Sequence, residues 1–400
     1  MTPTADFDAK ARRNVFVLSA SQALLMIGTS TMIAEAALVG YMLADNKSLA
    51  TLPVGLMQMV VMLTMFPASF FMKRFGRRLG FSVGASFGIA GQALCVYSIF
   101  EGSFVLFCVG SMLNGVYNGC GQFYRFAAVD GVGPSARGKA ISYVLAGGVF
   151  AAIVGPEIAR HTHDMFSPVA FGGSFAALAL VAILALLVVQ LIDIAPPSDA
   201  ERMAATRPLW QILAQPKAAV AVLSGVVAYA VMSLVMNATP LAMIACGMVF
   251  GDAARTIQAH VLAMFAPSFF TGAIVARFGV VRVMMAGAVL LAATALFTLT
   301  GIEFWNFYVG LILLGLGWNF LYIGATTLLT ETYTPAERAK TQAANDFLVF
   351  GSVSAAAVLA GWMHNTVGWA AINWGVLPAI AAAFAALMWL TLRARAPQNA

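Results

Sequence analysis

Long apolar runs separated by short polar breaks extend along the whole chain. A helix that crosses a bilayer needs about 20 mostly apolar residues. These runs are continuous and lack the strict alternation of a membrane-spanning strand. The pattern therefore predicts an all-α membrane protein with twelve transmembrane helices. The runs lie near residues 15–39, 50–71, 79–100, 103–127, 141–159, 169–192, 218–241, 254–275, 283–301, 305–328, 342–363 and 370–391.

The composition agrees with this fold class and narrows the chemistry. Hydrophobic residues make up 61% of the chain and charged residues 10%, which excludes a water-soluble core. The four cysteines have no Cys-x-x-Cys spacing, so we expect neither a disulfide framework nor a metal site. The chain also has no G-x-x-x-x-G-K-[ST] loop for nucleotide phosphates. We expect a protein that is not an enzyme, needs no cofactor and is not itself an ATP-driven motor.

Two short patterns imitate catalytic or metal sites. Residues 84–88 match G-x-S-x-G, but a nucleophilic serine needs a strand-turn-helix elbow and these residues lie inside a predicted helix. Small residues four positions apart permit close helix packing there. Residues 161–164 read His-Thr-His-Asp without further ligands nearby. We interpret this segment as an exposed loop.

The charge distribution predicts the topology. The formal net charge is +6, and cytoplasmic loops of membrane proteins are enriched in Lys and Arg. Lys47, Arg160 and Arg255 fall on one side of the predicted helices and Arg125 falls inside a span, which leaves eighteen of the 22 basic residues on the other side. We expect that side, with both termini, to be cytoplasmic. The excess of basic over acidic residues then reflects the topology, and it does not point to a nucleic-acid partner.

A polar break with four prolines, residues 193–216, divides the chain into two halves. We expect an N-terminal six-helix bundle at 1–192, a cytoplasmic loop at 193–217 and a C-terminal bundle at 218–400. The halves repeat each other, which indicates an ancient duplication. Asp130, Pro134, Arg137 and Lys139 recur 201 positions later as Glu331, Pro335, Arg338 and Lys340, and residues 74–76 recur 203 positions later as 277–279.

The six-plus-six layout, the central loop and the loop after the second span resemble the major facilitator superfamily. The loop motif of that family reads G-x-L-a-D-r-x-G-r-r. Its matching positions here are Arg74, Gly76, Arg77 and Arg78, with Arg277 and Gly279 in the second copy. The acidic position of the motif holds Lys73 in the first copy and Ala276 in the second. Because the resemblance assigns that acid to the cytoplasmic gate, another contact must hold the gate here.

The resemblance implies that spans one, four, seven and ten line a central cavity. These four spans carry polar or aromatic stripes at helical spacing, whereas spans six, nine and twelve are almost purely Ala, Leu and Val. The alternative is that the amides only join helices to one another. The candidate substrate-binding residues are Gln22, Asn114, Asn118, Gln122, Arg125, Tyr229, Asn237, Trp318, Asn319 and Tyr322.

Ionisable residues within the membrane suggest a gate and a coupling site, because an unpaired charge there is costly. Arg125 and Asp346 lie at similar depth in opposite halves, so we expect them to pair in the outward-open state and separate in the inward-open state, with Lys73 as reserve partner. The alternatives are that Arg125 snorkels and Asp346 caps its own helix. Glu157 is expected to pair with Arg160. Glu35, without a local cation, is the candidate proton carrier.

These features predict a secondary active transporter of the cell inner membrane that moves one small organic solute by alternating access, with proton symport. Amides, aromatic rings and one cation suit a neutral or weakly anionic, ring-bearing solute, and the chain resembles proteobacterial vitamin uptake carriers, riboflavin carriers in particular. The expected partners are this solute, protons and the lipid bilayer, with the protein as a monomer. The alternatives are a drug or metabolite efflux antiporter and, from another class, a non-transporting sensor or assembly factor.

Overall fold

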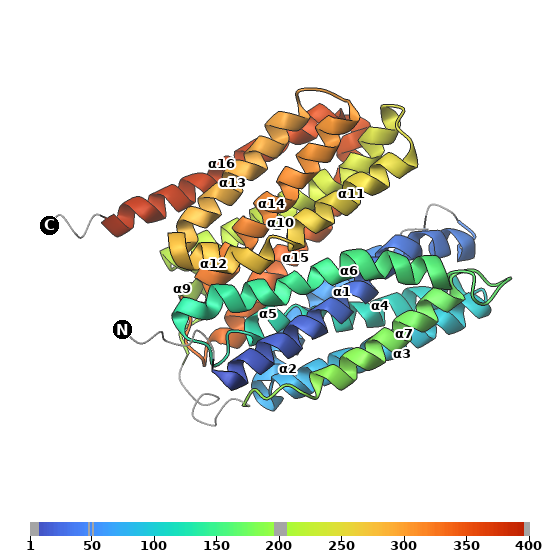
Figure 1. Cartoon of the computed structure of the whole chain (residues 1–400), viewed down its shortest axis with the longest axis horizontal. Coiled ribbons are helices and arrows are strands. Elements are labelled where there is room, and N and C mark those ends of the chain that lie inside the picture. Colours follow the sequence, from blue (N-terminus) through green and yellow to red (C-terminus); the bar gives the residue numbers. More distant parts are fainter. Residues whose placement is uncertain (1–7, 47–48, 50–51, 196–205, 396–400) are drawn as a thin grey trace. The chain divides into compact units, whose positions relative to one another are not determined.

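The computed structural model of the chain describes residues 8–46, 49, 52–195 and 206–395, and the regular structure in these ranges is helical throughout (Figure 1). The helices are α1 (Ala9–Leu43), α2 (Leu52–Phe75), α3 (Arg77–Phe100), α4 (Phe104–Gly121), α5 (Tyr124–Ala127), the 3-10 turn η2 (Pro134–Ala136), α6 (Arg137–Thr162), α7 (Gly172–Val189), α9 (Leu209–Leu213), α10 (Pro216–Ala245), α11 (Phe250–Phe265), α12 (Ser268–Phe278), α13 (Val280–Thr298), α14 (Phe304–Leu329), α15 (Arg338–Thr366) and α16 (Gly368–Arg395).

The predicted all-helical transmembrane fold is confirmed, with one span bent and one interrupted. Within the described ranges, eleven helices are long and apolar enough to cross a membrane, and α11 and α12 form a twelfth candidate bent by 42°. Pro267 lies at this bend, where its missing N–H and its ring interrupt the helical hydrogen bonds. Span four is not continuous either, because α4 ends at Gly121 and the short α5 follows.

Contacts divide the chain into two compact units. Unit 1 holds residues 1–134, 143–204 and 342–347, and unit 2 holds 135–142, 205–341 and 348–400. Unit 1 therefore includes a short part of α15, and unit 2 includes the start of α6. The division into 1–192, 193–217 and 218–400 follows the chain and stays a prediction.

Glycine contacts between helices have counterparts in the two units. In unit 1, a β-carbon on Gly84 would lie 2.5 Å from Cβ of Cys120, so α3 and α4 pack closely there. In unit 2, a β-carbon on Gly287 would lie 2.6 Å from the backbone nitrogen of Leu321. Gly287 follows Gly84 by 203 positions and Leu321 follows Cys120 by 201. Residues 84–88 thus serve helix packing, as the sequence predicts.

The repeated loop has the same backbone in both units. Gly76 has φ 89° and Gly279 has φ 88°, a conformation that side chains with a β-carbon rarely adopt. Each glycine ends one helix and starts the next. The preceding arginines agree too, because Arg74 lies 5.3 Å from the ring centre of Phe75, and Arg277 lies 5.3 Å from that of Phe278.

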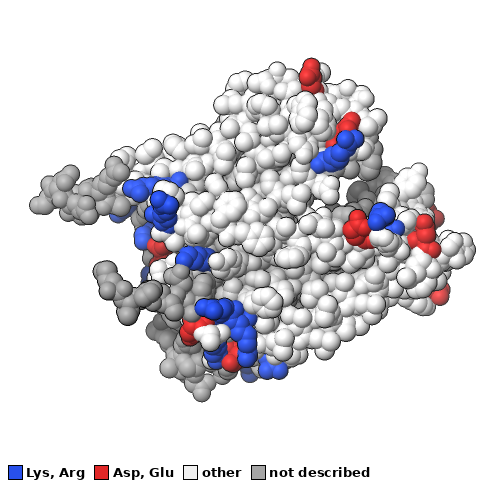
Figure 2. Space-filling view, in the orientation of Figure 1, with Lys and Arg blue, Asp and Glu red and all other residues white. Residues whose placement is uncertain are grey.

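Charged side chains on the face in Figure 2 gather towards the ends of the helices, and the surface between them is uncharged. This distribution fits contact with hydrocarbon along the middle of the helices. Inside unit 1, Phe107 and Phe175 meet edge to face with ring centres 5.4 Å apart, in an apolar cluster with Met32. The apolar interior of the bundle therefore joins α1, α4 and α7.

Candidate functional site

Arg125 and Asp346 form a buried ion pair within unit 1. The guanidinium nitrogen Nη2 lies 2.5 Å from Oδ1 of Asp346, and the side chains are 2% and 0% exposed. Arg125 also donates to the carbonyl and side-chain oxygens of Gln122, at 3.0 and 3.2 Å. Asn345 donates to the same Asp346 oxygen at 2.8 Å. The predicted pairing is confirmed as a contact, and its part in gating stays a proposal.

Both alternatives for this pair are wrong. Arg125 is almost fully buried, so it does not snorkel to an aqueous interface. Asp346 lies well inside α15, which begins at Arg338, so it cannot cap that helix. The sequence placed the helix start at residue 342 because the preceding segment is polar. Among the described residues, Asp346 is ion-paired with Arg125 and not with Lys73, so the reserve pairing finds no support.

Arg77 makes a second contact to the same part of α15, because its Nη2 donates to Oε1 of Gln342 at 3.0 Å. Its Nε lies 3.2 Å from Oδ2 of Asp130, in the segment after α5. Arg77 is only 6% exposed. Gln342 precedes Asp346 by one helical turn, so one face of α15 receives both Arg77 and Arg125. Sequence reasoning placed Arg77 in the conformational loop but missed Gln342, which gives no signal beyond its polarity.

The other loop residues are peripheral. Arg74 and Arg78 are exposed and Lys73 is half-buried. Arg78 donates to Oε1 of Gln190 at 3.3 Å. Gly76 and Gly279 provide the positive-φ turns described above. Their role in conformational change stays a prediction.

The polar stripe of span four lies against α1 and α3 inside unit 1. Thr29 donates to Oδ1 of Asn118 at 2.7 Å, and Asn118 donates to the carbonyl of Asn114 at 3.3 Å. Gln92 donates to Oδ1 of Asn114 at 3.0 Å. These residues border an internal cavity of about 10 Å³, which holds about one water molecule and no organic solute. Gln22 is buried on α1.

An aromatic cluster in unit 2 joins three of the predicted binding residues. The ring of Tyr229 on α10 meets Trp318 and Tyr322 on α14 edge to face, with centres 5.1 and 4.6 Å apart. Trp318 and Tyr322 stack at 5.1 Å. Phe265 and Phe350 complete the cluster, at 5.7 Å from Trp318 and 5.5 Å from Tyr229. Sequence reasoning missed both phenylalanines, because nothing distinguishes them from other apolar residues of their spans.

Two amides of the predicted stripes bind their own bundle. Asn319 donates to the carbonyl of Met264 at 2.6 Å and to Oγ of Ser268 at 2.7 Å, and it accepts from Thr271 at 2.7 Å. It thereby joins α14 to the bent pair α11 and α12. Asn237 donates to the carbonyl of Ser233 at 2.6 Å. The contacts of Asn319, like those of Asn114 and Asn118 in unit 1, match the helix-joining alternative, whereas the Asn237 contact lies within α10. Solute binding by these residues stays a prediction.

Glu35 is buried inside unit 1 at 5% exposure. Its Oε1 accepts from Ser174 of α7 at 3.0 Å, and Ser174 in turn accepts from Thr162 of α6 at 3.3 Å. Within the part of the chain that the structure describes, Oε2 of Glu35 has no hydrogen-bond partner. A third membrane acid besides Glu35 and Asp346, Glu157, pairs with Arg160 at 2.8 Å, as the sequence predicts.

Comparisons with known proteins identify the fold and the relatives. The profile of the Major Facilitator Superfamily matches residues 18–264 and 256–400. The riboflavin transporter RfnT of Brucella anthropi is 43% identical over 374 residues, which cover 93% of this chain and 94% of RfnT. The uncharacterized MFS-type transporter YdeG of Bacillus subtilis is 28% identical over 374 residues, 88% of this chain and 85% of YdeG.

Solved structures agree with this fold. The transporter FucP in the outward conformation superposes with a TM-score of 0.71 at 17% identity, covering 94% of this chain and 98% of FucP. The human organic anion transporter MFSD10 superposes with a TM-score of 0.76 at 14% identity, covering 95% of this chain and 100% of MFSD10. At these identities the similarity establishes the fold alone.

Proposed function

This chain belongs to the Major Facilitator Superfamily and is a secondary transporter that crosses the membrane many times, and from this premise we propose that it takes up riboflavin. The observation that carries the proposal is the 43% identity to a riboflavin transporter along nearly the full length of both chains. The proposed location is a bacterial inner membrane with both termini in the cytoplasm, supported by the uneven distribution of Lys and Arg.

The aromatic cluster of unit 2 is the proposed binding site for the flavin ring. Trp318 and Tyr322 are 0% and 1% exposed, so the cluster must open before a flavin can stack on it. Trp318 and Tyr322 are stacked and Tyr229 stands across them. Aromatic faces and edges of this kind bind a flat ring with favourable geometry. Nε1 of Trp318 has no hydrogen-bond partner among the described residues, and it supplies a donor for a ring carbonyl. Solute contacts by Asn118 and Gln122 of span four, in unit 1, stay a separate prediction.

The contacts of α15 in unit 1 are the proposed gate. A buried ion pair breaks only when its charges regain water or other partners. We assign the pair of Arg125 and Asp346, supported by Arg77 and Gln342, to closure in the outward-open state and to separation in the inward-open state. This pair takes the place of the family acid whose positions hold Lys73 and Ala276.

Glu35 is the proposed proton carrier. Its buried carboxyl has one oxygen on Ser174 and one without a partner in the described chain. An acid buried within a membrane-spanning helix is rare and costly, which makes it a candidate for proton transfer. Protonation from the outer side would then accompany solute uptake as symport.

Riboflavin uptake by the purified protein tests the proposal. Proteoliposomes containing the protein should accumulate labelled riboflavin, and expression should restore growth of a riboflavin auxotroph on low riboflavin. Proteoliposomes that contain the Trp318→Ala variant should bind and transport less riboflavin than those with the wild-type protein. If expression fails to rescue the auxotroph and the protein instead exports riboflavin or another ring compound, an efflux antiporter is favoured. Absence of substrate-dependent flux in either direction would favour a sensor or assembly factor.

A further inference from the structure

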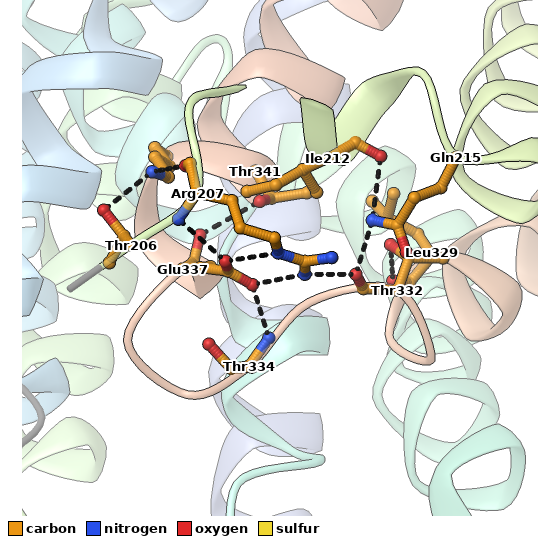
Figure 3. Close-up of polar contacts among 10 residues, drawn as sticks. Thr206, Arg207, Ile212, Gln215, Leu329, Thr332, Thr334, Glu337 and Thr341 are labelled. Atoms are coloured by element: carbon orange, nitrogen blue, oxygen red, sulfur yellow. Dashed lines mark hydrogen bonds and ion pairs between the residues drawn. The ribbon is translucent and has the colours of Figure 1, made fainter. Parts of the chain in front are cut away.

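Glu337 is held by an unusually complete set of donors in unit 2 (Figure 3). Nε and Nη2 of Arg207 donate to its two carboxylate oxygens at 2.7 and 2.6 Å. The backbone N–H groups of Arg207 and Thr334 donate to the same oxygens at 3.1 and 3.0 Å. The carboxylate is only 3% exposed. Chiefly because of the hydrogen bonds from Arg207, the pKa of Glu337 is lowered to about 2, so the pair stays ionised at neutral pH.

Further contacts bind the chain before α10 to the loop between α14 and α15. Arg207 and Gln215 both donate to the carbonyl of Thr332, at 3.2 and 3.0 Å. Lys340 donates to Oγ1 of Thr206 at 2.8 Å and to the carbonyl of Arg207. We call the contacts of Arg207 with Glu337, Thr332 and Lys340 the Arg207 clasp. A bidentate guanidinium pair restricts orientation more than a single contact does.

The acid of the clasp occurs in the second repeat only. Arg338 and Lys340 have counterparts 201 positions earlier in Arg137 and Lys139, but the counterpart of Glu337 is Ala136. An alanine side chain cannot accept a hydrogen bond. The acid therefore acts at α15 only and not at the corresponding helix α6.

Glu337 is also the residue directly before α15. Its carbonyl accepts from the backbone and the hydroxyl of Thr341, at 3.2 and 3.0 Å. The next two turns carry Gln342 and Asp346, which contact Arg77 and Arg125. A rotation of the first turn of a helix is passed to the following turns, since its backbone hydrogen bonds are continuous.

We propose that Arg207 is a positioning residue for transport: by fixing Glu337 it sets the start of α15 and so the place of Asp346 beside Arg125. This inference rests on the proposed gating role of that pair. Loss of the clasp should loosen α15 at its first turns and slow the conformational change. Solute affinity should be spared, because no residue of the clasp belongs to the proposed binding site.

The variant Arg207→Gln in the full-length protein tests the inference, with Arg207→Lys as a charge-retaining variant. The matched control is Lys217→Gln, because Lys217 pairs with Glu331 at 2.9 Å but is 56% exposed. Backbone hydrogen exchange of residues 338–346 and riboflavin transport are measured together. Arg207→Gln should exchange faster there and transport about fivefold more slowly, with an unchanged half-saturating concentration. Arg207→Lys should lie between it and wild type, and the control should match wild type.

Combination with Asp346→Asn shows whether Arg207 acts through Asp346. If both residues act through the same ion pair, the reductions in transport rate caused by the two substitutions should not add. The double variant should therefore transport as slowly as Asp346→Asn alone. Unchanged exchange at 338–346, a higher half-saturating concentration, or additive rate effects would overturn the proposal. A failed gate assignment looks different, because Asp346→Asn itself would then transport normally. That result would also remove this role for Arg207.

Discussion

Arg125 and Asp346 are 221 positions apart in the sequence, and their side chains meet at 2.5 Å in a place closed to solvent. Removing one partner of a buried pair leaves an uncompensated charge and typically costs about 3–5 kcal/mol. Arg125→Gln and Asp346→Asn should each lower the thermal stability and slow transport strongly, to a rate that is still measurable. The exchanged pair, Arg125→Asp with Asp346→Arg, should recover part of both. A double-mutant cycle without coupling energy would refute the functional pair.

Replacing the amides of span four tests the solute contacts proposed for unit 1. Asn118→Leu and Gln122→Leu should each reduce riboflavin transport about tenfold, the scale of one lost buried hydrogen bond. Asn118 is itself bonded to Thr29 within its bundle. Asn319→Leu, which removes contacts to Met264 and Ser268, is therefore the control for the loss of a helix-joining amide. It should lower thermal stability first. Normal uptake by both Asn118→Leu and Gln122→Leu would remove span four from the binding site.

Proton coupling is tested at Glu35. Glu35→Gln should abolish accumulation driven by a pH gradient and spare riboflavin exchange, because exchange requires binding and conformational change but no net protonation change. Glu157→Gln is the matched control, since Glu157 is an exposed acid paired with Arg160. Both variants are measured in proteoliposomes with and without an imposed gradient. Accumulation by Glu35→Gln that still follows the gradient would assign coupling to another residue.

The glycine turns predict a stability difference between two kinds of glycine. Gly76→Ala and Gly279→Ala should each destabilise the protein by about 1–3 kcal/mol, because φ values of 89° and 88° are strained for alanine. Gly55→Ala in α2 should be neutral or slightly stabilising, since a β-carbon there meets no atom within 4 Å and helical glycine is unfavourable. Thermal melting of the detergent-solubilised variants measures this. Equal melting temperatures for all three would contradict the positional argument.

The clasp predicts a pH dependence of stability with a definite sign. The pKa of Glu337 is about 2 in the folded protein against an ordinary 4.5. A lowered carboxyl pKa contributes stability that is full above 4.5 and is lost as the pH falls towards 2. The melting-temperature difference between wild type and Glu337→Gln should therefore be constant near neutrality and shrink below pH 4.5. A difference that grows on acidification would show that another group dominates.

The sequence predicted the positions of the helices well, but it predicted only some of the side-chain contacts. Hydropathy reports which segments tolerate hydrocarbon, so all twelve runs correspond to helices or to the bent pair at Pro267. The pairing of Arg125 with Asp346 could be predicted from the sequence, because opposite charges at equal depth are rare in a membrane. Polarity alone could not tell that Asn319 faces its own bundle, since a stripe on a helix fixes a face but not its neighbour.

The contacts of Arg207 and Gln342 could not be predicted from the sequence. Arg207 follows a proline-containing polar segment and looks like any solvated loop cation. Its partner Glu337 lies 130 positions away, beside the repeated loop but with no acid at the corresponding position of the first copy. Repeat comparison reveals shared residues, so a contact present in one half only escapes it.

The tryptophans give the molecule a built-in optical reporter. Five of the seven, Trp210, Trp305, Trp362, Trp374 and Trp389, are 48–69% exposed, whereas Trp318 is 0% exposed. Emission that disappears in Trp318→Phe therefore comes from the ring cluster with Tyr229 and Tyr322. A flavin bound at that cluster would quench this component most strongly, because energy transfer from an indole to a flavin falls steeply with distance; the difference in quenching between wild type and Trp318→Phe isolates it. Occupancy of the proposed binding site can thus be followed in unlabelled protein, in real time and without transport.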